Sequence, residues 1–312
     1  MYSLTDIKRR HLIKAGLFAA TTAPFARLLP AQTIVPSMKL IRRQIPGTEE
    51  FLPVIGMGTW QTFDVGSNAA ERANLKQVLQ TFIDKGGSLI DSSPMYGTSE
   101  EVAGDLAAEL GELPALFMAT KVWTQGKEAG IRQMEQSMRE MRRDPMDLMQ
   151  IHNLLDLQTH LKTLRRWKDE GKIRYLGITH YTDSAHDELE RLIKKEELDF
   201  IQINYSINDR NADQRLLPTA QDHGVAVLIN RPFSGGSLFQ QIKGKELPAW
   251  AADHDIQSWG QYFLKYIVSH PAVTCAIPAT SKVHHMEDNM QAGYGRLPDE
   301  KVRQEMVKYL MN

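Results

Sequence analysis

The chain has 312 residues, of which 42% are hydrophobic and 24% are charged, the composition of an ordinary globular protein. Its formal net charge of −1 gives no basis for nucleic acid or an anionic membrane surface as a partner. The single cysteine, Cys275, excludes an intramolecular disulfide and a zinc site built from cysteines. Because it lies in an apolar run, Cys275 is predicted to be a small core residue.

The first 31 residues differ from the rest of the chain and predict an export signal. A basic start at residues 8–14 (KRRHLIK) precedes a short, mildly apolar stretch and then small residues. The apolar stretch is too short to span a bilayer stably. The pair Arg9-Arg10 resembles a twin-arginine signal, although its flanking residues depart from the usual pattern. The resemblance implies the twin-arginine export machinery as a transient partner, cleavage after Ala31 and a periplasmic protein. The alternative is a disordered basic tail on a cytoplasmic one.

Eight short apolar runs follow. They predict buried parallel strands, because strands buried on both faces consist almost entirely of hydrophobic residues. They lie at residues 54–58, 88–90, 116–119, 148–151, 175–178, 200–203, 225–229 and 273–277. Between most of them lie segments with helical periodicity, at 69–85, 100–110, 131–142, 157–170 and 184–195. Strand and helix alternating eight times favour an α/β fold of the closed (β/α)8 TIM-barrel type.

Two segments fall outside this alternation. Residues 39–45, before the first strand, are expected to form a small N-terminal β-hairpin. Residues 231–257 form a long loop with prolines and glycines after the seventh strand, and long loops at such positions tend to be functional. Without an internal repeat or a linker, residues 38–312 are predicted to be a single barrel domain.

Polar residues end three consecutive runs. Asp91 ends the second run, Lys121 the third and His152 the fourth, and Tyr96 lies five residues after Asp91. Active residues of such barrels come from the C-terminal ends of the strands and the loops after them. We therefore expect these four side chains to meet above the barrel.

The group has a coherent chemistry. A carbonyl that accepts hydride develops negative charge on oxygen and needs a proton donor. Tyr96 is the predicted acid, and Lys121 is expected to lower its high pKa. Asp91 would keep the lysine charged, and His152 would orient the carbonyl. Taken singly, each residue has another interpretation, such as a helix cap, a surface lysine or a structural histidine.

At this point the sequence resembles a family. The stretches at residues 56–61 (GMGTWQ), 89–97 (LIDSSPMYG), 119–121 (ATK) and 150–152 (QIH) are similar to those of the aldo-keto reductases, over about residues 38–312. The resemblance implies NADPH-dependent reduction of aldehydes or ketones, with the cofactor at the C-terminal mouth of the barrel. The two glycines at 56 and 58 are not a Rossmann fingerprint, because a third glycine and a following helix are missing.

The resemblance also implies cofactor contacts. Gln202 and Thr179 match residues that bind the carboxamide, whereas His180 stands where many members have asparagine. Tyr205 matches the aromatic residue that stacks on the nicotinamide. The loop at 232–238 resembles the one that wraps the pyrophosphate, and its expected contacts are Ser234, Gly235 and Leu238.

The adenosine end departs most from the family pattern. Ser281 and Lys282 resemble a phosphate-binding pair, and Asp288 and Asn289 match residues that hold adenine, but Ala279 replaces a common lysine. NADPH is favoured, with NADH possible. The pair His284-His285 is not expected to ligate a metal, since adjacent side chains rarely bind one ion and no carboxylate cluster accompanies them.

The expected wall of the substrate pocket consists of Trp60, Met95, Trp123 and Asn153, and its aromatic side chains favour apolar or aromatic carbonyls. Two rival functions remain at this stage. One is a non-catalytic accessory subunit that binds a nicotinamide nucleotide. The other is a barrel enzyme of another class, such as a lyase or hydrolase.

Overall fold

The computed structural model describes residues 38–311. The predicted export signal at residues 1–31 lies outside the described residues. Eight strands form one sheet in which every neighbouring pair is parallel, in the order β10-β9-β8-β7-β6-β5-β4-β3. They are β3 (Met57–Gly58), β4 (Leu89–Asp91), β5 (Phe117–Val122), β6 (Met146–His152), β7 (Ile173–Thr179), β8 (Phe200–Asn204), β9 (Ala226–Asn230) and β10 (Cys275–Ala276).

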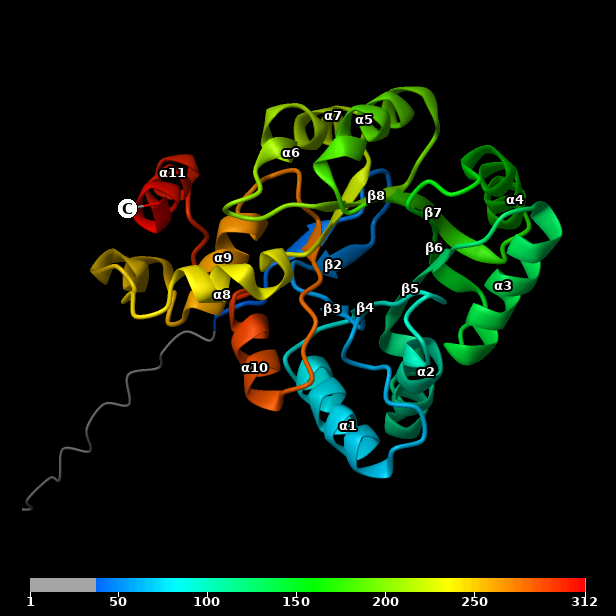
Figure 1. Ribbon diagram of the computed structural model, residues 1–312, viewed down its shortest axis with the longest axis horizontal. Helices are drawn as coiled ribbons and strands as arrows, with labels where there is room; N and C mark the ends of the chain where they lie inside the picture. The colour runs from blue at the N-terminus through cyan, green and yellow to red at the C-terminus, as the bar shows by residue number, and fades with distance from the viewer. Residues whose placement is uncertain (1–37, 312) are drawn as a thin grey trace, which may run out of the picture. The chain divides into compact units, whose positions relative to one another are not determined.

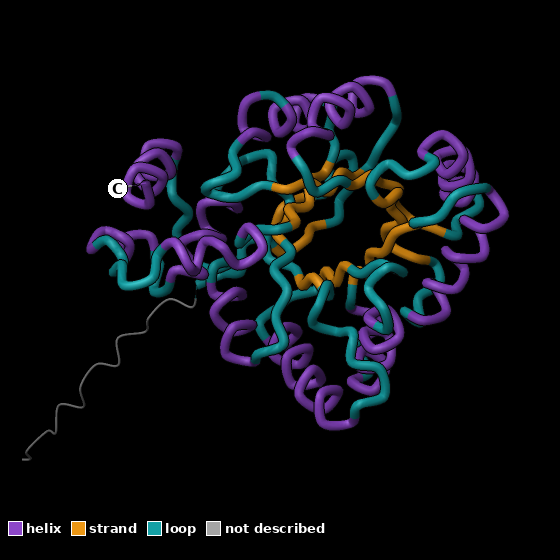
Figure 2. The backbone as a smooth tube through the Cα atoms, viewed as in Figure 1, coloured by secondary structure: helices purple, strands orange, loops and turns teal. Residues whose placement is uncertain are grey.

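The two edges of this sheet meet and close the barrel. Parallel bridges join Ile55 to Ala276 and Gly58 to Ala279, and the Gly56 N–H donates to the Ala276 carbonyl at 2.8 Å. Figure 2 shows the strands as a ring with the helices outside it. Each predicted apolar run overlaps one of the eight strands, so the predicted (β/α)8 fold is confirmed.

The helices cover the outer face of the ring (Figure 1). Their amphipathic faces and the outward side chains of the strands form one large core. They are α1 (Ala69–Asp84), α2 (Ser99–Leu110), α3 (Lys127–Glu140), α4 (Leu157–Asp169), α5 (His186–Lys195), α6 (Asn211–Gln214), α7 (Leu216–Asp222), α8 (Ser237–Gln241), α9 (Trp259–Val268), α10 (Val283–Gln291) and α11 (Glu300–Met311). Within the described residues, no helix is both long and apolar enough to cross a membrane.

The predicted N-terminal hairpin exists, but the prediction of its strands was wrong. β1 (Arg42–Gln44) pairs antiparallel with β2 (Phe51–Pro53), so the second strand lies outside residues 39–45. Ile45 and Leu52 carry the hairpin into the barrel, where they join a cluster of inward side chains from the first halves of the strands, including Phe117 and Phe200. The hairpin thus closes the N-terminal end of the barrel. Cys275 is buried in the same cluster, as predicted.

The long segment after β9 is present, and short helices subdivide it. It contains the 3-10 turn Ser234–Gly236, helix α8 and the 3-10 helix Ala249–His254 before α9 begins at Trp259. Gly235 and Gly236 have backbone φ values of +67° and +92°, which residues other than glycine rarely adopt. Replacing either glycine would therefore strain the backbone of this loop.

Helices α2 and α3 are tied to β5 by a buried carboxyl group. Glu100 on α2 is bonded to the hydroxyl of Thr120, which precedes Lys121 on β5, and accepts a 3.0 Å hydrogen bond from Ser137 on α3. Burial raises the pKa of Glu100 to about 7, with the nearby Glu140 acting in the same direction and the two hydroxyl bonds and Lys121 opposing. The folded chain therefore holds a proton here that the unfolded chain loses near pH 4.5.

This proton gives a first prediction. Because the folded-state pKa is raised, the stabilisation it provides is full below about pH 4.5 and is lost as pH rises through 7. Between pH 4.5 and 8, the wild-type free energy of unfolding should fall by about 2–3 kcal/mol more than that of Glu100→Gln. Urea denaturation of both proteins across this range measures the difference, and parallel curves would contradict the assignment.

Candidate active site

Four side chains from neighbouring strands meet at the C-terminal end of the barrel. Asp91 ends β4, His152 ends β6, and Lys121 is the penultimate residue of β5. The Lys121 Nζ lies 2.7 Å from the Asp91 Oδ2 and 2.6 Å from the Ser92 carbonyl oxygen, and the lysine is fully buried. The ring of Tyr96 lies with its centroid 5.2 Å from this ammonium group. The structure therefore brings the predicted group together.

Asp91 is held from several sides. Its Oδ1 accepts hydrogen bonds from the Gln150 amide at 3.1 Å and from the Gln202 amide at 2.8 Å. Its backbone carbonyl accepts from the Thr59 hydroxyl at 3.0 Å. Burial alone disfavours the Lys121 ammonium, but Asp91 and then Tyr96 outweigh it and raise the pKa of Lys121. A charged lysine is thus fixed beneath the tyrosine.

The expected tuning of Tyr96 is only partly seen. Burial raises the pKa of Tyr96 above its ordinary value, with Asp91 adding to the rise and Lys121 opposing it. Lys121 therefore favours the phenolate as expected, but it does not bring the pKa below that of a free tyrosine in this structure. Tyr96 remains a protonated hydroxyl at neutral pH, which is the form that a proton donor needs.

His152 is a neutral base beside this group. Burial lowers the pKa of His152 to about 3, with the charge of Lys121 and then His180 acting in the same direction. Its Nδ1 lies 3.1 Å from the Ser93 hydroxyl, and its ring meets that of Tyr96 edge-on at 6.0 Å. A neutral imidazole has one donor and one acceptor nitrogen, so the ring can hydrogen-bond a carbonyl oxygen without carrying charge.

The residues predicted for the carboxamide contact lie next to this group. Thr179 ends β7, and its hydroxyl donates to the Gln202 Oε1 at 3.4 Å. Since the other end of the Gln202 amide donates to Asp91, both ends of that side chain are already engaged. His180 is half-buried, and its carbonyl accepts from the Asn230 amide at 3.1 Å. A ligand at this place would have to share the Gln202 contacts.

Tyr205 was predicted to stack on the nicotinamide, and the structure does not support this. Its ring is fully buried and packs against Tyr266 and His270. Its hydroxyl donates to the Asp213 Oδ1 at 2.6 Å and accepts from Arg303. The ring has no exposed face for a ligand, and its hydroxyl is bonded to residues of α6 and α11.

The predicted pyrophosphate contacts lie in the loop after β9. The Ser234 hydroxyl lies 2.9 Å from the Ser206 hydroxyl and donates a hydrogen bond to the Asn208 Oδ1 at 2.6 Å, so it is tied to the segment after β8. Gly235 is exposed, whereas the side chain of Leu238 is fully buried. Leu238 can therefore contact a ligand only through its backbone.

The predicted adenosine contacts lie around the start and middle of α10. Ser281 and Lys282 precede the helix and are exposed, and Asn289 is buried. Both carboxylate oxygens of Asp288 are engaged, one with the Ser258 hydroxyl at 2.6 Å and the other with the Gln261 amide at 2.7 Å. In this structure Asp288 links α10 to the start of α9.

The predicted pocket wall forms an exposed rim. Trp60 is 48% exposed and Trp123 is 42% exposed, with its ring 6.4 Å from that of His152, and Met95 is also exposed. The Asn153 Oδ1 is buried and has no hydrogen-bond partner among residues 38–311. Exposed aromatic side chains and a buried polar atom without a partner are each typical of a binding site.

Sequence reasoning missed several residues of the site. Tyr181 is 46% exposed at the end of β7, stacked on His180 at an interplanar angle of 8°. Gln150 forms a hydrogen bond with Asp91, and Ser93 forms one with His152. Gln150 had a signal, as a polar residue inside a buried apolar run. Tyr181 also had one, as an aromatic residue two positions after a strand end.

Comparisons with known proteins agree with this geometry. The sequence model of the Aldo/keto reductase family matches residues 54–305. The methylglyoxal reductase YeaE of Escherichia coli (strain K12) is 27% identical over 246 residues, covering 76% of this chain and 84% of that protein. An NADH-specific methylglyoxal reductase of the same organism is 28% identical over 260 residues, covering 72% and 78%.

Solved structures show the same relationship. An aldo/keto reductase from Klebsiella pneumoniae in complex with NADP and acetate has a TM-score of 0.69 and 27% identity, and the match covers 83% of this chain and 92% of that one. An aldo-keto reductase from the same organism in complex with NADPH has a TM-score of 0.70 and 28% identity, with 85% and 94% covered. The chain belongs to the Aldo/keto reductase family.

Proposed function

We propose that this protein reduces an aldehyde or ketone to an alcohol, with NADPH as hydride donor and Tyr96 as proton donor. The observation that carries the proposal is the buried Lys121–Asp91 ion pair beneath Tyr96, with neutral His152 alongside. Binding alone does not require a tyrosine placed over a buried ammonium group. Membership of the family and the nucleotide complexes of the related Klebsiella structures support the same activity.

The mouth has features that fit a nicotinamide nucleotide. The Oδ1 atoms of Asn153 and Asn230 are buried at strand ends without a partner among the described residues, so the site offers acceptors to a polar ligand. Thr179, His180 and Asn230 would hold the carboxamide, and the loop around Gly235 the pyrophosphate. Ser281 and Lys282 would meet the adenosine phosphate, which favours NADPH over NADH. When bound, the cofactor supplies hydride to the carbonyl carbon.

The residues of the chain supply the proton and the electrostatics. His152 donates a hydrogen bond to the carbonyl oxygen and fixes its position. The Tyr96 hydroxyl transfers its proton to that oxygen as negative charge develops on it. The Lys121 ammonium stabilises the phenolate that remains, and Asp91 keeps the lysine charged in its buried position.

Replacing the proton donor gives the direct test. Tyr96→Phe should lower kcat for aldehyde reduction at least 100-fold, because general acids typically contribute 10²–10⁴-fold. The affinity for NADPH, measured by fluorescence titration, should stay within about twofold, since the hydroxyl is not a predicted cofactor contact.

Tyr205→Phe is the matched control, because it removes the same hydroxyl from a buried tyrosine outside the reacting group. It should leave kcat within a few-fold of wild type and lower the melting temperature instead. Full turnover by Tyr96→Phe would overturn the proton-donor role. Nucleotide binding without turnover in the wild-type protein would favour the accessory-subunit alternative.

The exposed rim supports a preference for apolar or aromatic carbonyls. Trp60, Trp123 and Tyr181 surround the mouth and remain 42–48% exposed, so a ligand that covers them would bury apolar surface. Because two relatives are named methylglyoxal reductases, methylglyoxal is a suitable small substrate to compare with an aromatic aldehyde.

The rim gives a prediction about specificity. Trp123→Ala should lower kcat/KM for benzaldehyde at least tenfold and for methylglyoxal less than threefold, because only the larger substrate covers the indole ring. Steady-state kinetics with both aldehydes measure the ratio. Equal losses for the two substrates would mean that Trp123 only supports the fold of the rim.

We also propose that the first 31 residues direct export through the twin-arginine route, and that the chain leaves the cytoplasm folded with its cofactor bound. The basic and apolar pattern of residues 8–20 supports this. The protein should then be recovered from the periplasmic fraction about thirty residues shorter, as measured by intact mass. Recovery of only full-length protein from the cytoplasm would refute export.

A further inference from the structure

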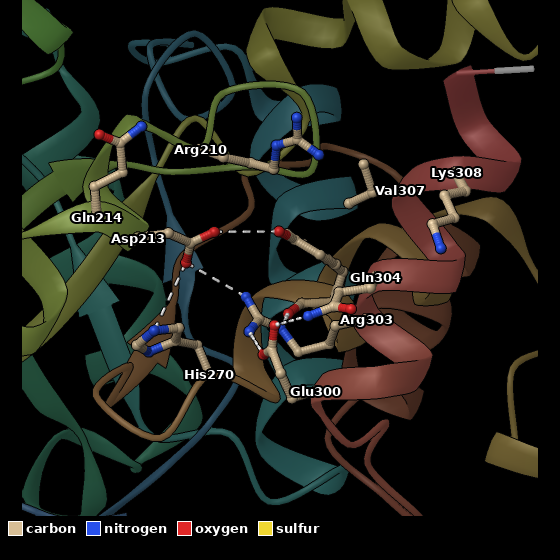
Figure 3. Close-up of a pocket in the computed structure, with 10 residues that line it drawn as sticks. Arg210, Asp213, Gln214, His270, Glu300, Arg303, Gln304, Val307 and Lys308 are labelled. Carbon is tan, nitrogen blue, oxygen red and sulfur yellow. Dashed lines mark hydrogen bonds and ion pairs between the residues drawn. The ribbon is translucent and has the colours of Figure 1, made fainter.

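A cavity of about 630 Å³ lies on the flank of the barrel, between α6, the end of α9 and one face of α11. None of the four side chains that meet at the barrel mouth lines it, so it is separate from the reductase site. Six charged or titratable side chains border it, and they are drawn in Figure 3: Arg210, Asp213, His270, Glu300, Arg303 and Lys308.

The two carboxylates of the cavity are already paired. Arg303, which is 5% exposed, lies 3.4 Å from the Asp213 Oδ1 and 2.6 Å from the Glu300 Oε2. Burial of His270, aided by the charge of Arg303, lowers its pKa, so this ring is neutral at neutral pH. Arg303 thus pairs with both carboxylates, and its single positive charge is set against their two negative charges.

Two further cations of the wall have no such partner. Arg210 and Lys308 make neither an ion pair nor a side-chain hydrogen bond with any residue between 38 and 311. Arg210 reaches the cavity from the segment before α6, and Lys308 reaches it from α11 (Figure 3). With three cations against two carboxylates and a neutral histidine, the cavity carries a surplus of one positive charge.

We propose that this cavity binds a small anionic molecule whose phosphate or carboxylate charge is met by Arg210 and Lys308. Its volume falls within the range of metabolite pockets, and the Tyr266 ring and Val307 add apolar surface to the wall. The guanidinium of Arg303 lies 4.7 Å from the Tyr266 ring centroid, which fixes that ring in place. An anion would complete the charge balance that the chain itself leaves open.

Calorimetric titration of the full chain with inorganic phosphate and with succinate tests the proposal. Saturating NADP+ keeps the added anions away from the barrel mouth. Constant ionic strength excludes an effect of general charge screening. The wild-type protein should bind one anion per chain, and the anion that binds identifies the chemistry as phosphate or carboxylate. The variant Arg210→Gln/Lys308→Gln should bind at least tenfold more weakly.

Lys301→Gln is the matched control, because Lys301 is an exposed lysine of α11 that does not border the cavity. It should bind like wild type. Without an anion, the double variant should melt close to the wild-type temperature, since neither removed side chain makes an ion pair or a side-chain hydrogen bond within the described residues. No binding of either anion to wild type, or equal binding by the double variant, would overturn the proposal. Both outcomes are independent of reductase activity.

Discussion

The buried ion pair between Lys121 and Asp91 is the interaction on which the site depends. A lone ammonium group at this depth would lose its proton or destabilise the fold by several kcal/mol. Here the pair lies at 2.7 Å, the lysine also meets the Ser92 carbonyl, and Asp91 accepts from Gln150 and Gln202. Because four barrel strands contribute to this set, the charge is stable only inside the closed barrel.

Barrel closure therefore serves both fold and chemistry. The hairpin fills the N-terminal end with Ile45 and Leu52, so the inward side chains are packed there and the polar residues gather at the other end. At that end the same burial that raises the pKa of Tyr96 keeps His152 neutral. A protonated tyrosine beside a neutral imidazole suits proton delivery to a carbonyl, whereas a charged histidine would repel the nearby ammonium.

Strand periodicity was sufficient to predict the barrel and the meeting of Asp91, Lys121 and His152, because parallel strands bring their C-terminal ends to one side. It failed where contacts are distant in sequence. Tyr205 follows a strand end like a site residue, but its ring is fully buried and its hydroxyl accepts a hydrogen bond from Arg303, 98 residues away. The second hairpin strand and the partners of Glu100 were likewise set by tertiary contacts that no local pattern reveals.

Hydride transfer to a carbonyl depends, in the proposed reaction, on the buried ammonium group of Lys121. Reduction of an aldehyde with NADPH deuterated at the transferring carbon position tests it, with mass spectrometry of the alcohol. The wild-type protein should form an alcohol one mass unit heavier, and with Lys121→Met the label should appear at least 100-fold more slowly. Labelled alcohol formed by Lys121→Met at the wild-type rate would show that the reaction does not need the buried lysine.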